Sequence, residues 1–350
     1  MSVDERREVV AREQACLRPE GTVAVGEEQL RLAYTAALEP PPPEPMPRDP
    51  LRLPGGAGNT TRGEGVKRGV GFAVGFKNIM FSEGFDDSTA ARVKLFDDGS
   101  AEVNCASAEV GQGVSDVILQ VARTELGTDA VSLAPQSTAS VGSGGSTSAS
   151  RQTWMAASAV RDACRAAIAR RDRGEREVDV EIVYRHEETT PLDPETGQVT
   201  GERAHVAFSV CAMKVVAEVD VELGLTRIVW IGAAQDIGKA INPLAAEGQV
   251  QGGVAQGMGL AVMEEIQTRD GLITNASFTD YLIPTALDMP AMDVVFVEDP
   301  DPAGPFGAKG IGEPPTVTAT AAVASALRAA SGQPLTRVPV TPEALIGLAR

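Results

Sequence analysis

The chain has 350 residues, a formal net charge of −17, 43% hydrophobic residues and only 4% aromatic residues. This length allows one large domain or two ordinary ones with a substantial buried core, and the 36 Gly and 23 Pro indicate a globular fold rich in turns. The acidic balance argues against a nucleic-acid partner, because neutralising phosphates requires a surplus of Lys and Arg.

The first 65 residues differ in character from the remainder. Residues 1–39 carry a helical pattern with interspersed Glu and Arg, which ends at the proline-dense stretch from Pro40 to Pro54. We predict a helical arm and a Pro/Gly-rich linker over 1–65, of the kind that often wraps across a neighbouring subunit, and a compact domain over 66–350. The N-terminal MSVDERREVVAREQ is too charged for a secretory signal, and no apolar run approaches the roughly 18 residues of a membrane span. We therefore expect a cytoplasmic protein.

The predicted domain alternates between strand and helix patterns. Strands are expected in GVGFAVGF, in a hairpin that turns at Asp97-Asp98-Gly99, in VDVEIVYRHEE, as a pair within 204–236, and in MDVVFVED. Helical periodicity covers 114–126, 153–169, 253–265 and 317–330. The predicted fold class is α+β, with mixed sheets and packed helices.

The four cysteines are scattered and form no CxxC pair: Cys16, Cys105, Cys164 and Cys211. This spacing is unlike a disulfide framework, an iron–sulfur site or a structural zinc site. We expect them to be small buried residues.

Two Gly-rich segments precede predicted helices. Gly111, Gln112 and Gly113 stand directly before the helix at 114, and VGSGGSTSASRQT leads into the helix near Arg151. Glycine lets the backbone approach a ligand closely, and the free N–H groups of a first helical turn attract anions. Taken alone, the first segment leaves open an ordinary helix start, and the second leaves open a flexible surface loop.

Two later segments have unusual helices. In the first, several glycines crowd a predicted helix around Gln256, at a cost of about 1 kcal/mol each relative to Ala. Either tight helix packing or a large ligand would explain them, and the Gln256 amide could hydrogen-bond a polar cofactor. In the second, GAKGIGEPP ends in Glu313 followed by two prolines, which would fix this carboxylate in a pocket. A solvated glutamate capping the next helix is the alternative.

Taken in order, these segments resemble the molybdenum-binding part of the xanthine dehydrogenase and aldehyde oxidase family of molybdenum hydroxylases. The matching stretches run from about Val66 to the end of the chain: EVGQG at 109–113, STSASR at 146–151, QDIGKAINP at 235–243, EGQVQGGVAQGMG at 247–259, NASFTDYLIPTALDMP at 275–290 and GAKGIGEPP at 307–315. The resemblance implies the fold of the second half of that family's molybdenum subunit.

The resemblance also implies a molybdenum–molybdopterin cofactor, with the cytosine dinucleotide form as one candidate, and roles for individual residues. Glu313 falls where the family places its catalytic glutamate, which acts as a general base on a hydroxyl ligand of molybdenum. No side chain is expected to ligate the metal directly, because the pterin holds it, with Gln256 and Glu313 nearby. The residues implied to contact the cofactor are Gly111, Gln112, Gly113, Ser148, Ala149, Ser150, Arg151, Gln256, Gly310 and Gly312.

Nothing in the sequence corresponds to the family's earlier half of the molybdenum domain, or to its iron–sulfur and flavin modules. We therefore expect partner subunits that carry that first half, a 2Fe-2S centre and FAD, and we expect the chain alone to be inert. The leading hypothesis is a subunit of a xanthine dehydrogenase-type enzyme that hydroxylates a carbon of a purine or N-heterocycle, with water as the oxygen source. An aldehyde or nicotinate hydroxylase is the alternative within enzymes, and a non-catalytic assembly or cofactor-insertion protein is the alternative of another class. A dinucleotide-dependent dehydrogenase is disfavoured because no GxGxxG follows a strand with an acidic residue about 20 positions later.

Overall fold

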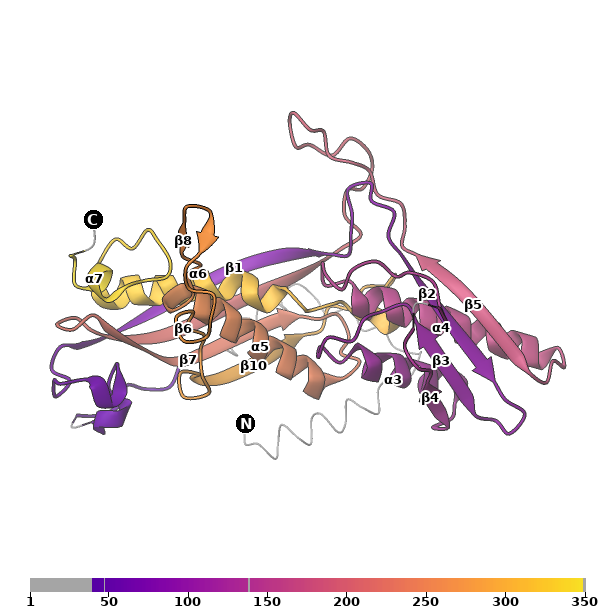
Figure 1. Ribbon diagram of the computed structural model, residues 1–350, viewed down its shortest axis with the longest axis horizontal. Coiled ribbons are helices and arrows are strands. Elements are labelled where there is room, and N and C mark those ends of the chain that lie inside the picture. Colours follow the sequence, from indigo (N-terminus) through magenta and orange to yellow (C-terminus); the bar gives the residue numbers. More distant parts are fainter. Residues whose placement is uncertain (1–39, 47, 138, 349–350) are drawn as a thin grey trace.

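The computed structural model describes residues 40–46, 48–137 and 139–348. In this part the chain forms two four-stranded sheets, each covered by its own helices, which lie beside each other along the long axis of the molecule (Figure 1). The predicted α+β class with mixed sheets and packed helices is confirmed. The helical arm predicted over 1–39, and Cys16 within it, lie outside the described residues.

The first sheet has the strand order β1-β6-β7-β10. Its strands are β1 (Val66–Ile79), β6 (Ala207–Asp220), β7 (Leu225–Asp236) and β10 (Ala291–Val297). The first three are antiparallel neighbours, whereas β10 runs parallel to β7. Helices α5 (Pro243–Val262) and α6 (Pro314–Ser331) cover one face, where their Ala and Val side chains share a core with β6 and β7.

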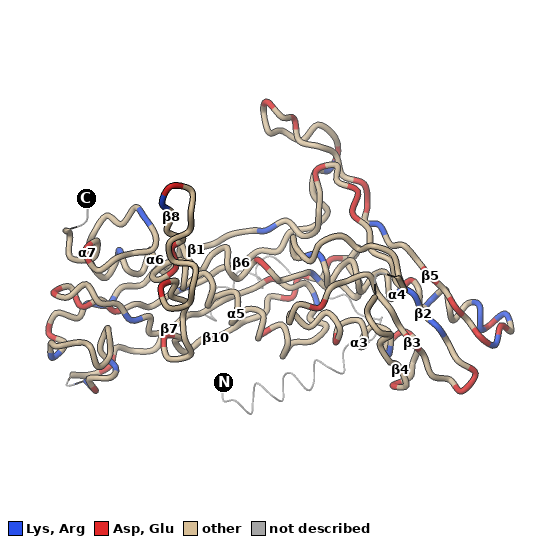
Figure 2. Tube along the Cα trace, viewed as in Figure 1, with Lys and Arg blue, Asp and Glu red and all other residues tan. Residues whose placement is uncertain are grey.

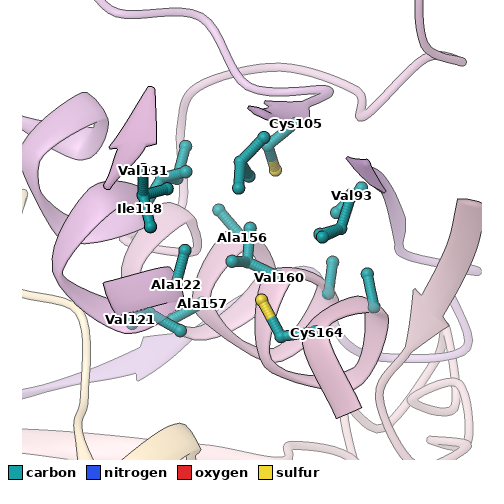
Figure 3. Close-up of a cluster of buried hydrophobic side chains, with 14 of the residues drawn as sticks. Val93, Cys105, Ile118, Val121, Ala122, Val131, Ala156, Ala157, Val160 and Cys164 are labelled. Atoms are coloured by element: carbon teal, nitrogen blue, oxygen red, sulfur yellow. The ribbon is translucent and has the colours of Figure 1, made fainter. Parts of the chain in front are cut away.

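The second sheet has the order β4-β3-β2-β5. Its strands are β2 (Ser88–Leu95), β3 (Ala101–Cys105), β4 (Val131–Leu133) and β5 (Val178–Arg185), and β2 and β3 form the predicted hairpin. Helices α3 (Val114–Leu126) and α4 (Gln152–Asp172) pack on it. Figure 3 shows Cys105 and Cys164 among the aliphatic side chains of this core, and Cys211 is likewise buried and free, as expected.

The lead-in from residue 40 packs on the first sheet before β1 begins at Val66. Arg48 Nη1 donates to Glu218 Oε2 at 2.7 Å, and Asn59 Nδ2 donates to Asp220 Oδ2 at 3.0 Å. The lead-in holds two short 3-10 helices, η1 (Pro50–Arg52) and η2 (Gly56–Gly58). The remaining short elements are β8 (Thr268–Arg269), β9 (Leu272–Ile273), η3 (Pro305–Gly307) and α7 (Pro342–Leu345). The division between an arm and a domain at 65/66 stays a prediction.

Helix α5 begins ten residues before the predicted start at Gly253 and ends at Val262. The side chain of Asn242 accepts from Ala245 N, and Pro243 occupies the first turn, which together start the helix early. Two of its glycines are explained by close packing, since a Cβ would meet Pro315 Cβ at 2.8 Å from Gly253 and Ala319 Cβ at 2.4 Å from Gly257. Tight packing against α6 therefore accounts for these two.

Strand β1 has two unlike faces because its residues alternate between glycine and larger apolar side chains. On the inner face α6 approaches the strand backbone so closely that a Cβ on Gly71 would stand 2.1 Å from Ala322 O. The outer face carries exposed side chains, which we call the β1 apolar stripe: Val70, Phe72, Val74 and Phe76. Phe208 of β6 extends it, in edge contact with Phe76.

The two helices of the first sheet, α5 and α6, contain few charged residues. In Figure 2 the traces of α5 and α6 are almost entirely tan, and Glu247 and Arg328 are their only charged residues. Even so, among the residues that the structure describes, no helix combines the length and the hydropathy needed to cross a membrane.

Candidate active site

Three chain segments meet around Glu313: the end of β1, the loop at 146–151 and the segment at 307–313. Met80, which follows β1, donates its N–H to Ala149 O at 2.9 Å. The loop in turn contacts the third segment, where a Cβ on Gly310 would stand only 1.7 Å from Ser150 O. Only glycine permits this approach, so the sequence at 310 fixes how near the two loops lie.

Glu313 is the N-cap residue of α6, and Pro314 and Pro315 form the first turn of the helix. Its side chain is 44% exposed, so the carboxylate is reachable from outside. Ser150 Oγ accepts from Glu313 N at 3.0 Å and lies 3.3 Å from Glu313 Oε2. Lys77 Nζ, from the inner face of β1, lies 2.8 Å from the same carboxylate oxygen. The structure thus brings Glu313 and Ser150 together, and it adds Lys77.

The loop at 146–151 has a strained backbone. Ala149 and Ser150 adopt φ of 55° and 53°, a left-handed conformation that non-glycine residues rarely take. The Ser148 hydroxyl bonds that of Ser146 at 2.7 Å. Such strain persists only where neighbouring groups hold the chain in place, and Arg151 supplies much of that restraint.

The Arg151 side chain is completely buried. Its guanidinium forms a two-point ion pair with Asp87, at 2.9 Å to Oδ2 and 2.5 Å to Oδ1, and also donates to Ser88 O, Thr89 Oγ1 and Ser146 O. This arginine therefore anchors the loop from beneath and does not present its charge on the surface. Its predicted cofactor contact stays a prediction.

The start of α3 already holds an anion, which is the carboxylate of Glu109. This side chain accepts from the backbone N–H groups of Gly111, Gly113 and Ser115, at 2.8, 3.0 and 3.0 Å. Burial opposes ionisation of Glu109, but these amide bonds outweigh it and hold its pKa below the usual value. The Gln112 amide is bonded to the backbone of Val110 and Ala108 in the same loop. An external anion would have to compete with Glu109 for these groups.

A small cavity of about 60 Å³ lies between this loop and α5. Its polar lining includes Gln112 of the α3 loop, Thr153 of α4 and Gln249 of α5. The predicted Gln256 lies about two turns further along α5, is exposed, and is not among the lining residues. Gln249 therefore lies nearer to the Gly-rich loop than Gln256 does, while the predicted role of Gln256 is untested.

Lys309 lies at the edge of the same cavity, within the GAKGIGEPP segment. Its ammonium is buried and pairs with Asp236 Oδ2 at 2.8 Å. Burial raises the pKa of Asp236, and the ammonium of Lys309 offsets this only in part. Because Lys309 N also donates to Ile237 O, the segment that delivers Glu313 is fixed to the end of β7.

A family model described as the molybdopterin cofactor-binding domain matches residues 56–181 and 174–290 of the chain. Among curated proteins, the chain resembles the 6-hydroxypseudooxynicotine dehydrogenase complex subunit gamma of Paenarthrobacter nicotinovorans, with 30% identity over 318 residues. This alignment covers 81% of the chain and 40% of that protein. It is 28% identical to a xanthine dehydrogenase molybdenum-binding subunit of Escherichia coli O157:H7, covering 80% of the chain and 42% of that subunit.

Among solved structures, an aldehyde oxidoreductase from Desulfovibrio gigas superposes with a TM-score of 0.75 at 26% sequence identity. The superposition covers 95% of the chain but 37% of the oxidoreductase. The chain thus spans about two fifths of the length of the relatives that it matches.

Proposed function

The chain belongs to the family of molybdopterin cofactor-binding domains that includes the molybdenum-binding subunits of xanthine dehydrogenases and aldehyde oxidoreductases, and from this premise we propose that it is the second half of the molybdenum subunit of a multi-subunit hydroxylase. The observation that supports catalysis most directly is Glu313, a carboxylate presented at the start of α6 where two Gly-containing loops converge. A chain that only assembled or inserted a cofactor would need no base at this place.

The residues present are suited to a polar, anionic cofactor such as molybdopterin. Gly111 and Gly113 leave open space where a Cβ would stand, and the buried Gln152 Oε1 lacks a hydrogen-bond partner in the described structure. No group of three His, Cys, Asp or Glu within the described residues could hold a metal ion. We propose that these residues hold a pterin through amides, hydroxyls and backbone groups, with the Glu109 carboxylate as the competitor at the start of α3.

When bound, a molybdenum–pterin centre would supply the oxygen-transfer and redox chemistry. The contribution of this chain is positional. Pro314 and Pro315 restrict the backbone beside Glu313, Ser150 holds its carboxylate, and the exposed side of the carboxylate is available to take a proton from a neighbouring hydroxyl. A positioned general base typically contributes about 10²–10⁴-fold in rate.

We propose a purine or other N-heterocycle as the substrate, as the relative named for xanthine suggests. The alternative is an aldehyde or nicotinate hydroxylase. The superposition on an aldehyde oxidoreductase supports the aldehyde form of this alternative. Steady-state rates of the assembled complex with xanthine, nicotinate, 6-hydroxypseudooxynicotine and an aromatic aldehyde would decide between them. Absence of xanthine turnover would refute a xanthine dehydrogenase-type activity, and turnover of the aldehyde alone would refute the choice of an N-heterocycle.

The proposed complex also contains a polypeptide that supplies the first half of the molybdenum domain, together with 2Fe-2S and FAD subunits, in the cytoplasm. The observation that supports a partner surface is the β1 apolar stripe, which exposes four large side chains along one strand face. Contiguous exposed apolar surface commonly marks an interaction site. Replacing Phe72 and Phe76 with Ser should weaken co-purification with that polypeptide.

The catalytic proposal is tested by Glu313→Gln in the complex, with Glu102→Gln as a matched control. Glu102 is also a glutamate paired with a lysine, since Lys94 Nζ lies 3.1 Å from its Oε1, but it belongs to β3. We expect the Glu313 variant to lose about 10²-fold or more in kcat at unchanged molybdenum content, and the control to retain activity. Molybdenum near one atom per copy with full activity of Glu313→Gln would refute the role of Glu313.

A further inference from the structure

We propose that Lys77 is a positioning residue that holds one oxygen of Glu313 and leaves the other free to react. The inference rests on the proposed role of Glu313 as a base, and it concerns a residue that the sequence motifs did not single out. Lys77 lies near the end of β1, on the inner face that packs towards α6. Its side chain is 22% exposed, half the exposure of the Glu313 side chain.

The hydrogen bonds of the Lys77 ammonium are fully used inside the protein. Nζ lies 2.8 Å from Glu313 Oε2, 2.7 Å from Asn78 O and 3.3 Å from Asn78 Oδ1. An ammonium has three N–H donors, and these acceptors match all of them. Lys77 therefore has no donor left for a substrate, so we assign it an effect on Glu313 and no direct contact with the reacting atoms.

The two carboxylate oxygens of Glu313 have different surroundings. Oε2 is held from two sides, by Lys77 Nζ and by Ser150 Oγ at 3.3 Å, whereas within the described residues no hydrogen bond reaches Oε1. Two contacts on one oxygen restrict rotation of the carboxylate, so Oε1 keeps one direction. A base gains its effect only when its reactive atom is held within reach of the proton it removes.

The elements that carry the pair are themselves fixed to each other. Lys77 is on β1 and Glu313 begins α6, and a Cβ at Gly75, two residues before Lys77, would stand 3.0 Å from Val317 Cγ1 and 3.2 Å from Thr318 Cγ2 of α6. Exposed ion pairs by themselves contribute little to stability. The function we infer for Lys77 is therefore orientation of the carboxylate.

The direct test is amine labelling of the full chain with trace acetic anhydride, read by peptide mass spectrometry. Lys67, exposed on the same strand, serves as the internal reference. If Lys77 engages the carboxylate, Glu313→Gln should raise its labelling relative to Lys67 by roughly twofold to fivefold, the range implied by measured exposed ion pairs. An unchanged Lys77-to-Lys67 ratio would overturn the proposal. Because labelling needs no cofactor or substrate, its outcome is independent of the proposed function.

The second test uses the assembled complex with the substrate that it turns over. We expect Lys77→Met to lower kcat by about tenfold or more with KM changed little, and Lys77→Arg to restore most of kcat, because a misplaced base costs rate rather than binding. A merely structural lysine would instead lower the melting temperature without a selective loss of kcat. Full kcat in a folded Lys77→Met complex would refute the positioning role, and Lys77→Gln provides a second variant should the Met variant not fold.

Discussion

The contact between Gly310 and Ser150 makes a sharp prediction for the substitution Gly310→Ala. A Cβ at residue 310 would lie 1.7 Å from Ser150 O, and real Cβ contacts stay above 3.0 Å, so the two segments would have to separate by at least about 1.3 Å. Both groups are buried and belong to backbone, so no flexible side chain can absorb the shift.

This separation should cost stability and displace the hydroxyl that bonds Glu313. Overpacking of this kind typically destabilises by roughly 1–3 kcal/mol, and Ser150 already has a left-handed backbone with little freedom to adjust. A displacement above 1 Å at a catalytic group can also cost about 10²-fold in rate. We therefore expect a lower urea midpoint for the chain and a lower kcat for the complex.

The matched control is Gly312→Ala, two residues later in the same loop. There the added Cβ would meet Ser150 Oγ at 3.8 Å, which is an ordinary contact, so the free energy of unfolding should change by less than about 0.5 kcal/mol. Equal urea midpoints for the two alanine variants would show that the close approach of the loops does not exist, and the geometry proposed for Glu313 would fail with it.

Three other properties can be measured on the same chain. Gly71→Ala should destabilise the chain by about 1–3 kcal/mol, because the new Cβ would stand 2.1 Å from Ala322 O. Gly252→Ala in α5 has open space around the new Cβ and should stabilise the chain by up to about 1 kcal/mol. Urea unfolding that ranked the two variants in the opposite order would contradict the packing. Burial raises the pKa of both Cys105 and Cys164 to about 12, so neither thiol should react with a thiol reagent at pH 8 until the protein unfolds. Rapid labelling of Cys105 or Cys164 in the native chain, assigned by peptide mapping, would exclude this core. Because the pKa of Glu109 is lowered in the folded state, its carboxylate stabilises the fold above the unfolded-state pKa, and this stabilisation is lost as the pH falls through the folded-state pKa. The difference in free energy of unfolding between wild type and Glu109→Gln should therefore narrow from pH 7 to pH 3. A constant difference would argue against the amide contacts.

Much of the fold follows from local patterns. The hairpin turning at Asp97-Asp98-Gly99 and the helix at 114–126 coincide with β2, β3 and α3, because alternation and periodicity report directly on which face is buried. The start of α5 was harder to predict, since the glycines of its sequence weaken the helical signal. Their compatibility with the helix depends on α6, which is distant in the sequence.

The candidate site was predicted only in part. Glu313 could be singled out because the prolines after it restrict the backbone, whereas the Gly/Ser-rich run before a helix indicated only a loop, and Ser150 within it was implied by the family resemblance. Lys77 could not be found this way: a lysine on a strand is usually a solvated residue, and its partner lies far along the chain. Glu109 is a similar case, because nothing in the sequence shows that its carboxylate folds back onto the amides of its own loop.

The phenylalanines on the outer face of β1 bear on how the protein is produced in a cell. Strand β1 is also the edge strand of its sheet, so it exposes both unpaired backbone groups and apolar side chains. Copies of the chain in which this face and edge stay uncovered would be prone to associate with one another, so a single strand sets the aggregation tendency of the chain.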